Sequence, residues 1–316
     1  MSILVSPAAD GELSVACRIL TSQFTGFEQQ VLMNRYHNLF ASRELDRSGL
    51  FLARRDGEPV GAMIVQALSG ALGLAWPPRV LPDLEQPAIE RQLAQVCCQW
   101  LQSQGSKICQ AFATSADRSL MQPLQVMGFR RITEVVHLHH TAFANEVLPH
   151  VEESLIFQMV QPDHLPEFTT TLLATYEGSQ DCPELTGDRT PEELVSGFIN
   201  LNSRSIAQWY LVKRAGMPIG VLLLEHGPEP DAVEVNYLGL IPNQRRSGWG
   251  THLVHYAMQF ASALGAKRLT LSVDSRNEAA RRLYEKLGFE EFDQREVYLA
   301  EWPQTTTGMN DIQVDA

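Results

Sequence analysis

The chain has 316 residues, of which 44% are hydrophobic and 20% are charged, and this composition excludes a largely disordered protein. The length predicts two domains of about 150 residues each. The formal net charge of −12 repels polyphosphate, so we expect no nucleic-acid partner, whereas it attracts a small cationic amine.

The cysteines and the apolar runs narrow the class of protein further. Five cysteines form no CxxC pair (Cys17, Cys97, Cys98, Cys109 and Cys182), which predicts neither a disulfide framework nor a zinc site. No apolar run approaches the roughly 18 to 20 residues that cross a bilayer, and the first residues lack a signal-peptide pattern. We therefore expect a cytoplasmic protein without a membrane partner.

An internal repeat organises the chain. Three pairs of segments match one another at nearly one offset: 56–65 with 215–224, 104–108 with 264–268, and 115–129 with 275–289. The repeat predicts two copies of one domain, at residues 1–145 and 152–302. The polar stretch 303–316 is predicted to be a flexible tail.

The second copy can be followed in chain order from its patterns of apolar residues. A strand at 155–160 precedes a helix at 163–176, which Asp163 can cap, and Thr190 to Glu193 form a capping box that opens a second helix reaching about Leu201. The later elements are strands at 209–214, 218–225 and 232–241, a helix at 248–265, a strand at 268–274, a helix at 277–288 and a strand at 290–300.

The segment QRRSGWGTHL at 244–253 joins a strand to a helix through glycines and arginines. The first turn of a helix has unpaired N–H groups and the positive end of the helix dipole, which together bind phosphate. Gly248 and Gly250 let the backbone approach an anion, and Arg245 and Arg246 can pair with phosphate oxygens. Taken alone, the segment fits a solvated basic turn equally well.

The context of this segment resembles the GNAT superfamily of acyl-CoA-dependent N-acetyltransferases. The family's pyrophosphate loop, Q/R-x-x-G-x-G/A, matches Arg245 to Gly250, and a second motif, VDSRNEAARRLYEKLGF, matches at 273–289. The resemblance implies that the backbone N–H groups from Arg246 through Ser247 and Trp249 to Thr251 hold the diphosphate of acetyl-CoA. It also implies an α/β (α+β) fold, in which each copy has a mixed, mostly antiparallel sheet with a splayed parallel pair and helices on both faces.

The same resemblance assigns the rest of the coenzyme site. The strand 232–241 is expected to part from the strand 268–274 beyond about Tyr237, so that backbone groups at Leu238 and Leu240 bond the pantetheine arm. Asn277 would bond this arm from the other side, while it can also act as a helix N-cap.

Transfer of an acyl group to an amine needs a base, a stabilised oxyanion and a proton for the leaving thiolate. The resemblance assigns the proton donor to Tyr284, which otherwise fits as a core aromatic. Glu234 stands where one branch of the family has its base, and it fits equally well as an outward-facing strand carboxylate. Asn236 shares its face and would position a water, and the N–H of Leu240 would stabilise the oxyanion.

The first copy lacks this chemistry. At the repeat offset, Leu74 replaces Glu234, Ala88 and Glu90 replace the two loop glycines, Asp117 replaces Asn277 and Leu124 replaces Tyr284. A carboxylate at the phosphate position opposes anion binding. We expect a degenerate, non-catalytic copy that is structural or helps to shape the acceptor site.

Other polar groups leave alternatives open. His137, His139 and His140 form HLHH, but a strand places only two of them on one side, and we predict no metal site. The loop 177–189 carries Glu177, Asp181, Glu184 and Asp188, which can receive a cationic acceptor or remain solvated. The leading interpretation is an acetyl-CoA-dependent N-acetyltransferase of a small molecule or peptide, and the alternative is a non-catalytic acyl-CoA sensor or scaffold.

Overall fold

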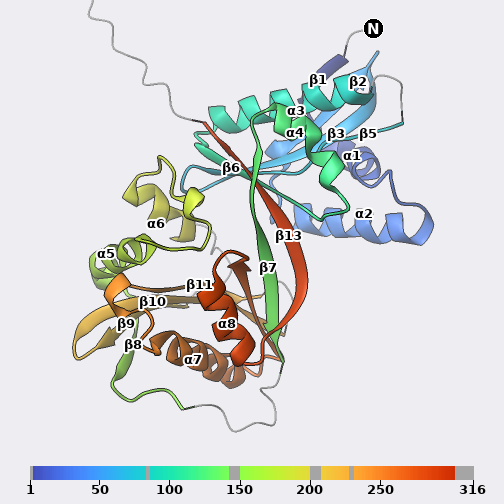
Figure 1. Ribbon diagram of the computed structural model, residues 1–316. Helices are drawn as coiled ribbons and strands as arrows, with labels where there is room; N and C mark the ends of the chain where they lie inside the picture. Colours follow the sequence, from blue (N-terminus) through green and yellow to red (C-terminus); the bar gives the residue numbers. More distant parts are fainter. Residues whose placement is uncertain (1–2, 83–85, 142–149, 200–207, 228–230, 303–316) are drawn as a thin grey trace, which may run out of the picture.

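A computed structural model describes residues 3–82, 86–141, 150–199, 208–227 and 231–302 (Figure 1). The predicted tail at 303–316 and the end of the helix predicted to reach Leu201 lie outside the described residues. No helix in the described ranges is long and apolar enough to cross a membrane.

The first repeat forms a sheet with two helices on each side. Its strands are β1 (Ile3–Pro7), β2 (Leu50–Arg55), β3 (Glu58–Leu68), β4 (Leu72–Ala75), β5 (Arg79–Val80), β6 (Ile108–Ala113) and β7 (Arg130–His140). Its helices are α1 (Leu13–Leu20), α2 (Gly26–Ala41), α3 (Gln86–Ser103) and α4 (Gln122–Val126), with short 3-10 turns at Asp10–Glu12, Arg47–Gly49 and Arg118–Met121.

The second repeat follows the predicted order of elements. Its strands are β8 (Leu155–Met159), β9 (Gln208–Arg214), β10 (Met217–His226), β11 (Ala232–Leu240), β12 (Arg268–Asp274) and β13 (Glu290–Glu301). Its helices are α5 (Leu165–Tyr176), α6 (Pro191–Ile199), α7 (Trp249–Ala263) and α8 (Glu278–Lys286), with 3-10 turns at Pro162–His164, Pro183–Leu185 and Pro242–Gln244.

Two predicted helix caps have different outcomes. The capping box before α6 is confirmed, because the amide of Glu193 donates to Thr190 Oγ1 at 3.2 Å and the amide of Thr190 donates to Glu193 Oε2 at 2.8 Å. The prediction that Asp163 caps α5 is wrong. A 3-10 turn absorbs Asp163, and His164 becomes the N-cap of the helix.

The two repeats exchange their last strands. The sheet has the order β1-β2-β3-β4-β6-β13-β7-β12-β11-β10-β9-β8, with β5 paired to β3. Strand β13 of the second repeat therefore pairs with β6 of the first, and β7 of the first repeat pairs with β12 of the second. In Figure 1 these two long strands cross from one half of the molecule to the other. The predicted boundary between 145 and 152 separates the repeats in the sequence but does not divide the sheet.

The exchanged strands also contribute to the cores of both halves. Val136 and Leu138 of β7 lie in the core under α7 and α8, while Tyr298 and Ala300 of β13 lie in the core under α3 and α4. Strands β4–β6 and β11–β12 are parallel pairs in an otherwise mainly antiparallel sheet. The predicted fold class is confirmed, and the exchange places side chains of the first repeat beside the second.

Candidate active site

The loop before α7 presents a run of free backbone amides. Arg246 has φ +58° and Gly248, the N-cap of α7, has φ +85°. Among the described residues, the amides of Arg246 to Gly250 have no hydrogen-bond acceptor, so they can bind an anion. The amide of Thr251 differs from the prediction, because it donates to the carbonyl of Gly248 at 3.0 Å.

The side chain of Arg245 anchors this loop. Its Nε donates to the carbonyl of Leu240 at 3.0 Å, its Nη1 to that of Gly178 at 3.2 Å and its Nη2 to that of Thr175 at 2.9 Å. The prediction that both arginine side chains pair with phosphate is therefore revised for Arg245, which ties the loop to the end of α5. Arg246 and Ser247 remain exposed beside the free amides.

The parallel strands β11 and β12 part beside the loop, as predicted, although they part earlier. Their pairing ends at Val235 and Leu271, and β11 continues to Leu240 along β10. The amide of Ile241 donates to Ile219 on the β10 side at 3.0 Å. Because successive amides of a strand point to alternate sides, the amides of Leu240 and Leu238 point into the fork between β11 and β12.

Tyr284 lies on α8 with 7% of its surface exposed. Its hydroxyl has no hydrogen-bond partner among the described residues, which leaves it available to a ligand. Burial, with a smaller effect of the Asp181 charge, raises the pKa of Tyr284, so the phenol keeps its proton at neutral pH. The cap predicted at Asn277 is present, because its side chain accepts from the amide of Ala280 at 3.2 Å; its contact with a pantetheine arm stays a prediction.

Glu234 lies in β11 directly opposite Glu225 of β10. Burial raises the pKa of Glu234. Burial and the charge of Glu234 raise the pKa of Glu225 to about 7, although a hydrogen bond with Asn236 opposes this effect. Two half-buried carboxylates therefore lie side by side, and at neutral pH one of them is close to its midpoint of ionisation.

A β-bulge near the two carboxylates determines which side chains of β11 face α5 and α6. The register of β11 on β10 shifts between Leu223 and Leu224, which leaves Asn236 as the extra residue. Tyr237 consequently packs with the cluster under α5 and α6, on the side where Asn236 is also found. Strict alternation would have placed these two neighbours on opposite faces.

A cavity of about 440 Å³ opens at the fork. Asn236 and Tyr237 of β11 and Ser272 to Asp274 of β12 line it beyond the last paired residues of the two strands. The loop between α5 and α6 covers it, and the first repeat supplies part of its wall: Leu72, Gln110, Phe112, Val135 and His137. Glu234 is not among the lining residues.

The covering loop is pinned to the end of β12 by Asp274. The Arg276 guanidinium contacts Asp274 Oδ2 at 2.7 Å and Glu184 Oε1 at 2.7 Å. Thr133 of β7 donates to Asp274 Oδ1 at 2.6 Å. Although burial opposes ionisation, the hydrogen bonds from Arg276 and Thr133 bring the pKa of Asp274 to about 2, so this carboxylate is a fixed anion of the network. Glu184 is thereby engaged in structure and is not free for a cationic acceptor.

The first repeat also supports the cover of the cavity. Lys107 forms an ion pair with Glu193 of α6 at 2.9 Å. Gly70, with φ +76°, packs so closely on α6 that an added Cβ would lie 2.4 Å from the carbonyl of Glu193. This contact requires glycine, since any side chain there would displace α6 and the loop before it.

Sequence reasoning missed Glu225 and the role of His137 in this cavity. Glu225 could have been found from the sequence, because antiparallel pairing of β11 with β10 places Glu225 opposite Glu234. His137 reaches the cavity through the strand exchange and bonds Ser272 Oγ through Nδ1 at 2.8 Å. The described residues contain no group of three His, Cys, Asp or Glu side chains arranged to hold a metal ion.

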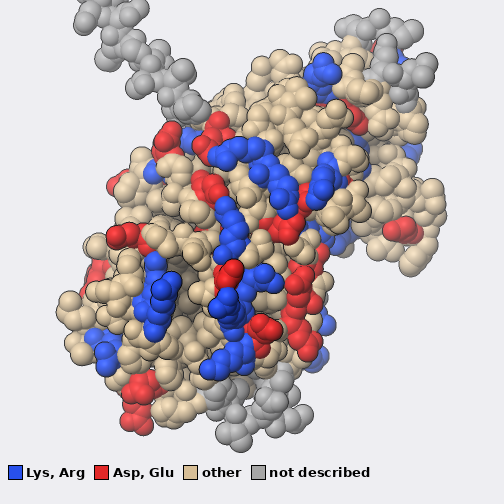
Figure 2. Space-filling view, in the orientation of Figure 1, with Lys and Arg blue, Asp and Glu red and all other residues tan. Residues whose placement is uncertain are grey.

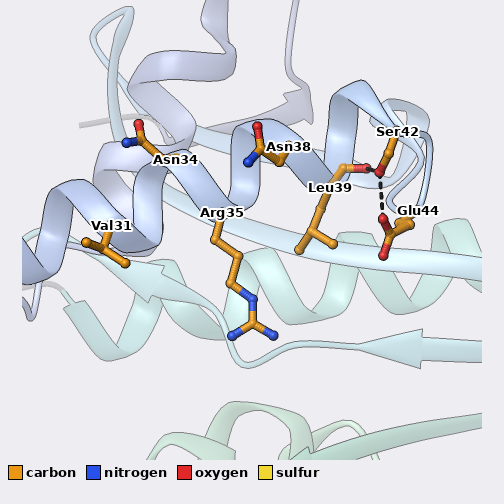
Figure 3. Close-up of a pocket in the computed structure, with 7 residues that line it drawn as sticks. All are labelled: Val31, Asn34, Arg35, Asn38, Leu39, Ser42 and Glu44. Carbon is orange, nitrogen blue, oxygen red and sulfur yellow. Dashed lines mark hydrogen bonds between the residues drawn. The ribbon is translucent and has the colours of Figure 1, made fainter. Parts of the chain in front are cut away.

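The equivalent positions of the first repeat have no such arrangement. Ala88 and Glu90 lie in the first turns of α3, where Gln86 Nε2 donates to Glu90 Oε1 at 2.9 Å, and Leu124 is buried on α4. A groove of about 410 Å³ runs along α2 (Figure 3), with Arg35 and Glu44 as its charged residues. This groove includes no part of a phosphate loop or a strand fork.

On the face of the molecule seen in Figure 2, basic and acidic side chains are interspersed. No large patch of a single sign extends over that face.

The fold and this site agree with comparisons to known proteins. A model of the Acetyltransferase (GNAT) family matches residues 172–289. An uncharacterised N-acetyltransferase of Mycobacterium tuberculosis is 32% identical over 109 residues, which are 31% of this chain and 69% of that protein.

Two solved structures match nearly the whole chain. A GCN5-related N-acetyltransferase from Sphaerobacter thermophilus has a TM-score of 0.60 at 16% identity and covers 95% of both chains. A tandem GNAT protein from the clavulanic acid biosynthesis pathway has a TM-score of 0.56 at 14% identity and covers 96% of this chain and 100% of its own. At these identities the two structures support the fold alone.

The matches to the family model and to the N-acetyltransferase of Mycobacterium tuberculosis support an acyltransferase. The chain belongs to the GNAT acetyltransferase family.

Proposed function

We propose that this protein transfers the acetyl group of acetyl-CoA directly to an amine, and that the second repeat carries the reaction. The main support is the run of amides from Arg246 to Gly250, which have no acceptor among the described residues. Five free N–H groups at a helix N-terminus suit a diphosphate. The open edge of β11 at Leu238 suits an amide of a pantetheine arm.

The reaction follows from these positions. The amine nitrogen attacks the thioester carbonyl carbon, and the amide of Leu240 stabilises the resulting oxyanion. Glu234 accepts a proton from the amine, through a water held by Asn236, and the C–S bond then breaks. Tyr284 gives its proton to the departing thiolate sulfur. The first repeat contributes the wall of the acceptor cavity and no catalytic group.

Calorimetry with coenzyme A tests the proposal directly. We expect one molecule bound per chain, and Gly248→Val should weaken binding by about tenfold or more, because a β-branched residue is strained at φ +85° and disturbs the amides. Gly105→Val is the matched control, since Gly105 has φ +86° but lies in the first repeat. No binding to wild type, or binding of two molecules per chain, would contradict the proposal.

A second measurement tests which of the two carboxylates, Glu234 or Glu225, acts as the general base. Glu234→Gln should lower kcat/KM by about 10²–10⁴-fold, the usual contribution of a general base. In wild type, kcat/KM should fall as the pH drops through the raised pKa of Glu234, because the protonated carboxyl cannot accept a proton. Glu225→Gln is the comparison variant, and it should lose less activity. If Glu225→Gln is the more damaging change, the role of the base passes to Glu225.

A further inference from the structure

The cavity at the fork contains one carboxylate with a free oxygen, that of Asp181. The amide of Asp274 donates to Asp181 Oδ1 at 2.8 Å. The amide of Ser275 bonds Glu134 on the β7 side, so the alternation of amides directs the Asp274 amide into the fork. Asp181 Oδ2 has no partner among the described residues, and Asp181 lines the cavity. This oxygen can hold the ammonium group of an acceptor before that group loses its proton.

The cavity also contains a guanidinium that forms no ion pair with any described residue. Arg189 Nε donates to the carbonyl of Leu185 at 2.9 Å, Nη2 donates to the same carbonyl, and Nη1 donates to the carbonyl of Gly70 at 3.3 Å. The nearest acidic group, Glu193, is engaged by Lys107 at 2.9 Å. Burial lowers the pKa of Arg189, so an added anion would stabilise its charge.

The geometry of Arg189 favours a carboxylate as this anion. Three of its five N–H groups donate to carbonyls, which leaves one N–H on each terminal nitrogen. A free N–H on each terminal nitrogen can donate to an oxygen of a carboxylate.

The cavity that both charged groups line has several apolar and aromatic side chains in its wall. Tyr176, Phe198 and Tyr237 line it from the second repeat, and Tyr176 and Phe198 both contact the Tyr237 ring, with centroids 5.7 and 5.5 Å away. Phe112 lines it from the first repeat and is 41% exposed. An apolar or aromatic body fits such a wall better than a hydrated polar chain.

We propose that the acceptor is an amino acid in the broad sense, with an amine for Asp181, a carboxylate for Arg189 and an apolar or aromatic body against Phe112 and Tyr237. This inference rests on the proposed function and specifies its acceptor. It also assigns the first repeat a part in substrate selection, because Phe112 lies on β6.

Matched pairs of acceptors test the inference on wild-type protein by release of free coenzyme A thiol. The pairs are phenylalanine with phenethylamine and 4-(aminomethyl)benzoate with benzylamine, which differ only in the carboxylate. In at least one pair, the carboxylate form should have a kcat/KM about tenfold higher or more, as expected for a charge-assisted bidentate contact. Glycine, which lacks the apolar body, should be poorer than either amino acid.

Two variants test whether Arg189 causes the preference for the carboxylate form. Arg189→Met should remove the preference for the carboxylate form and leave the amine without it nearly unaffected, whereas Arg18→Met, an exposed change on α1, should leave both unaffected. If Arg189→Met also disturbs the loop, the wild-type pairs still decide. Calorimetry with coenzyme A is run first, because absent binding overturns the proposed function itself. If coenzyme A binds and neither pair favours the carboxylate, or no amino acid reacts, only the acceptor assignment is overturned.

Discussion

Replacing Tyr284 with phenylalanine should lower kcat by about 10²–10⁴-fold, the usual contribution of a general acid. The variant removes one hydroxyl from a buried ring that packs at a tilt against Phe289, with centroids 5.7 Å apart. That hydroxyl has no partner among the described residues, so its removal leaves no other polar group unpaired. Folding and coenzyme A binding should therefore stay close to wild type.

The measurement combines turnover with calorimetry on the same samples. Tyr36→Phe is the matched control, because Tyr36 is another partly buried tyrosine, on α2 of the first repeat. A drop in kcat with unchanged affinity for coenzyme A supports the proton-donor role. Full turnover in Tyr284→Phe would remove that role. Absent turnover in wild type, together with tight binding of coenzyme A, would favour a sensor or scaffold.

The sequence predicted the phosphate loop because its signal is local. Two glycines, one of which has positive φ, a helix start and flanking arginines lie within ten residues, and the structure confirms a turn of free amides there. The role of Arg245 could not be read in the same way. Its partners, the carbonyls of Thr175 and Gly178, lie about seventy residues away in the chain, and no periodicity brings them to the loop.

The residues that line the cavity could not be predicted, because their positions depend on two features that residue patterns do not show. The bulge at Asn236 inserts one residue without a glycine or proline to mark it, so strict alternation predicts the wrong face for Tyr237. The second feature is the exchange of β7 and β13 between the two repeats. The two strands have the same kind of sequence, so the sequence does not indicate which half of the sheet each strand joins. His137 and Phe112 were therefore not expected in the same cavity as Asp181.

The strand exchange also makes the first repeat a structural part of the second. The second repeat supplies the loop, the fork and Tyr284, yet β12 has β7 of the first repeat as its antiparallel neighbour, over six residue pairs from Leu269 with His140 to Asp274 with Val135. Thr133, just before this ladder, bonds Asp274. The second half is therefore structurally incomplete without the first repeat.

Residues 150–302 expressed alone should consequently fail to fold. Loss of β7 removes Val136 and Leu138 from the core of this half, at about 1.5–3 kcal/mol for each buried side chain, and leaves one edge of β12 unpaired. These losses are a large part of the about 5–15 kcal/mol that stabilises a typical domain. Strand β13 would in turn expose Tyr298, which is 1% exposed beside β6 in the whole chain.

Co-expression of 1–145 and 146–316 as two chains is the control, because it keeps both exchanged strands and breaks only the connection between the repeats. The pair should copurify, bind one coenzyme A and unfold cooperatively in circular dichroism, whereas 150–302 alone should show no cooperative transition. A fragment that unfolds cooperatively and binds coenzyme A would mean that β13 can pair with β12 in place of β7. In that case the first repeat would be needed only for the wall of the acceptor cavity, to which it contributes Phe112.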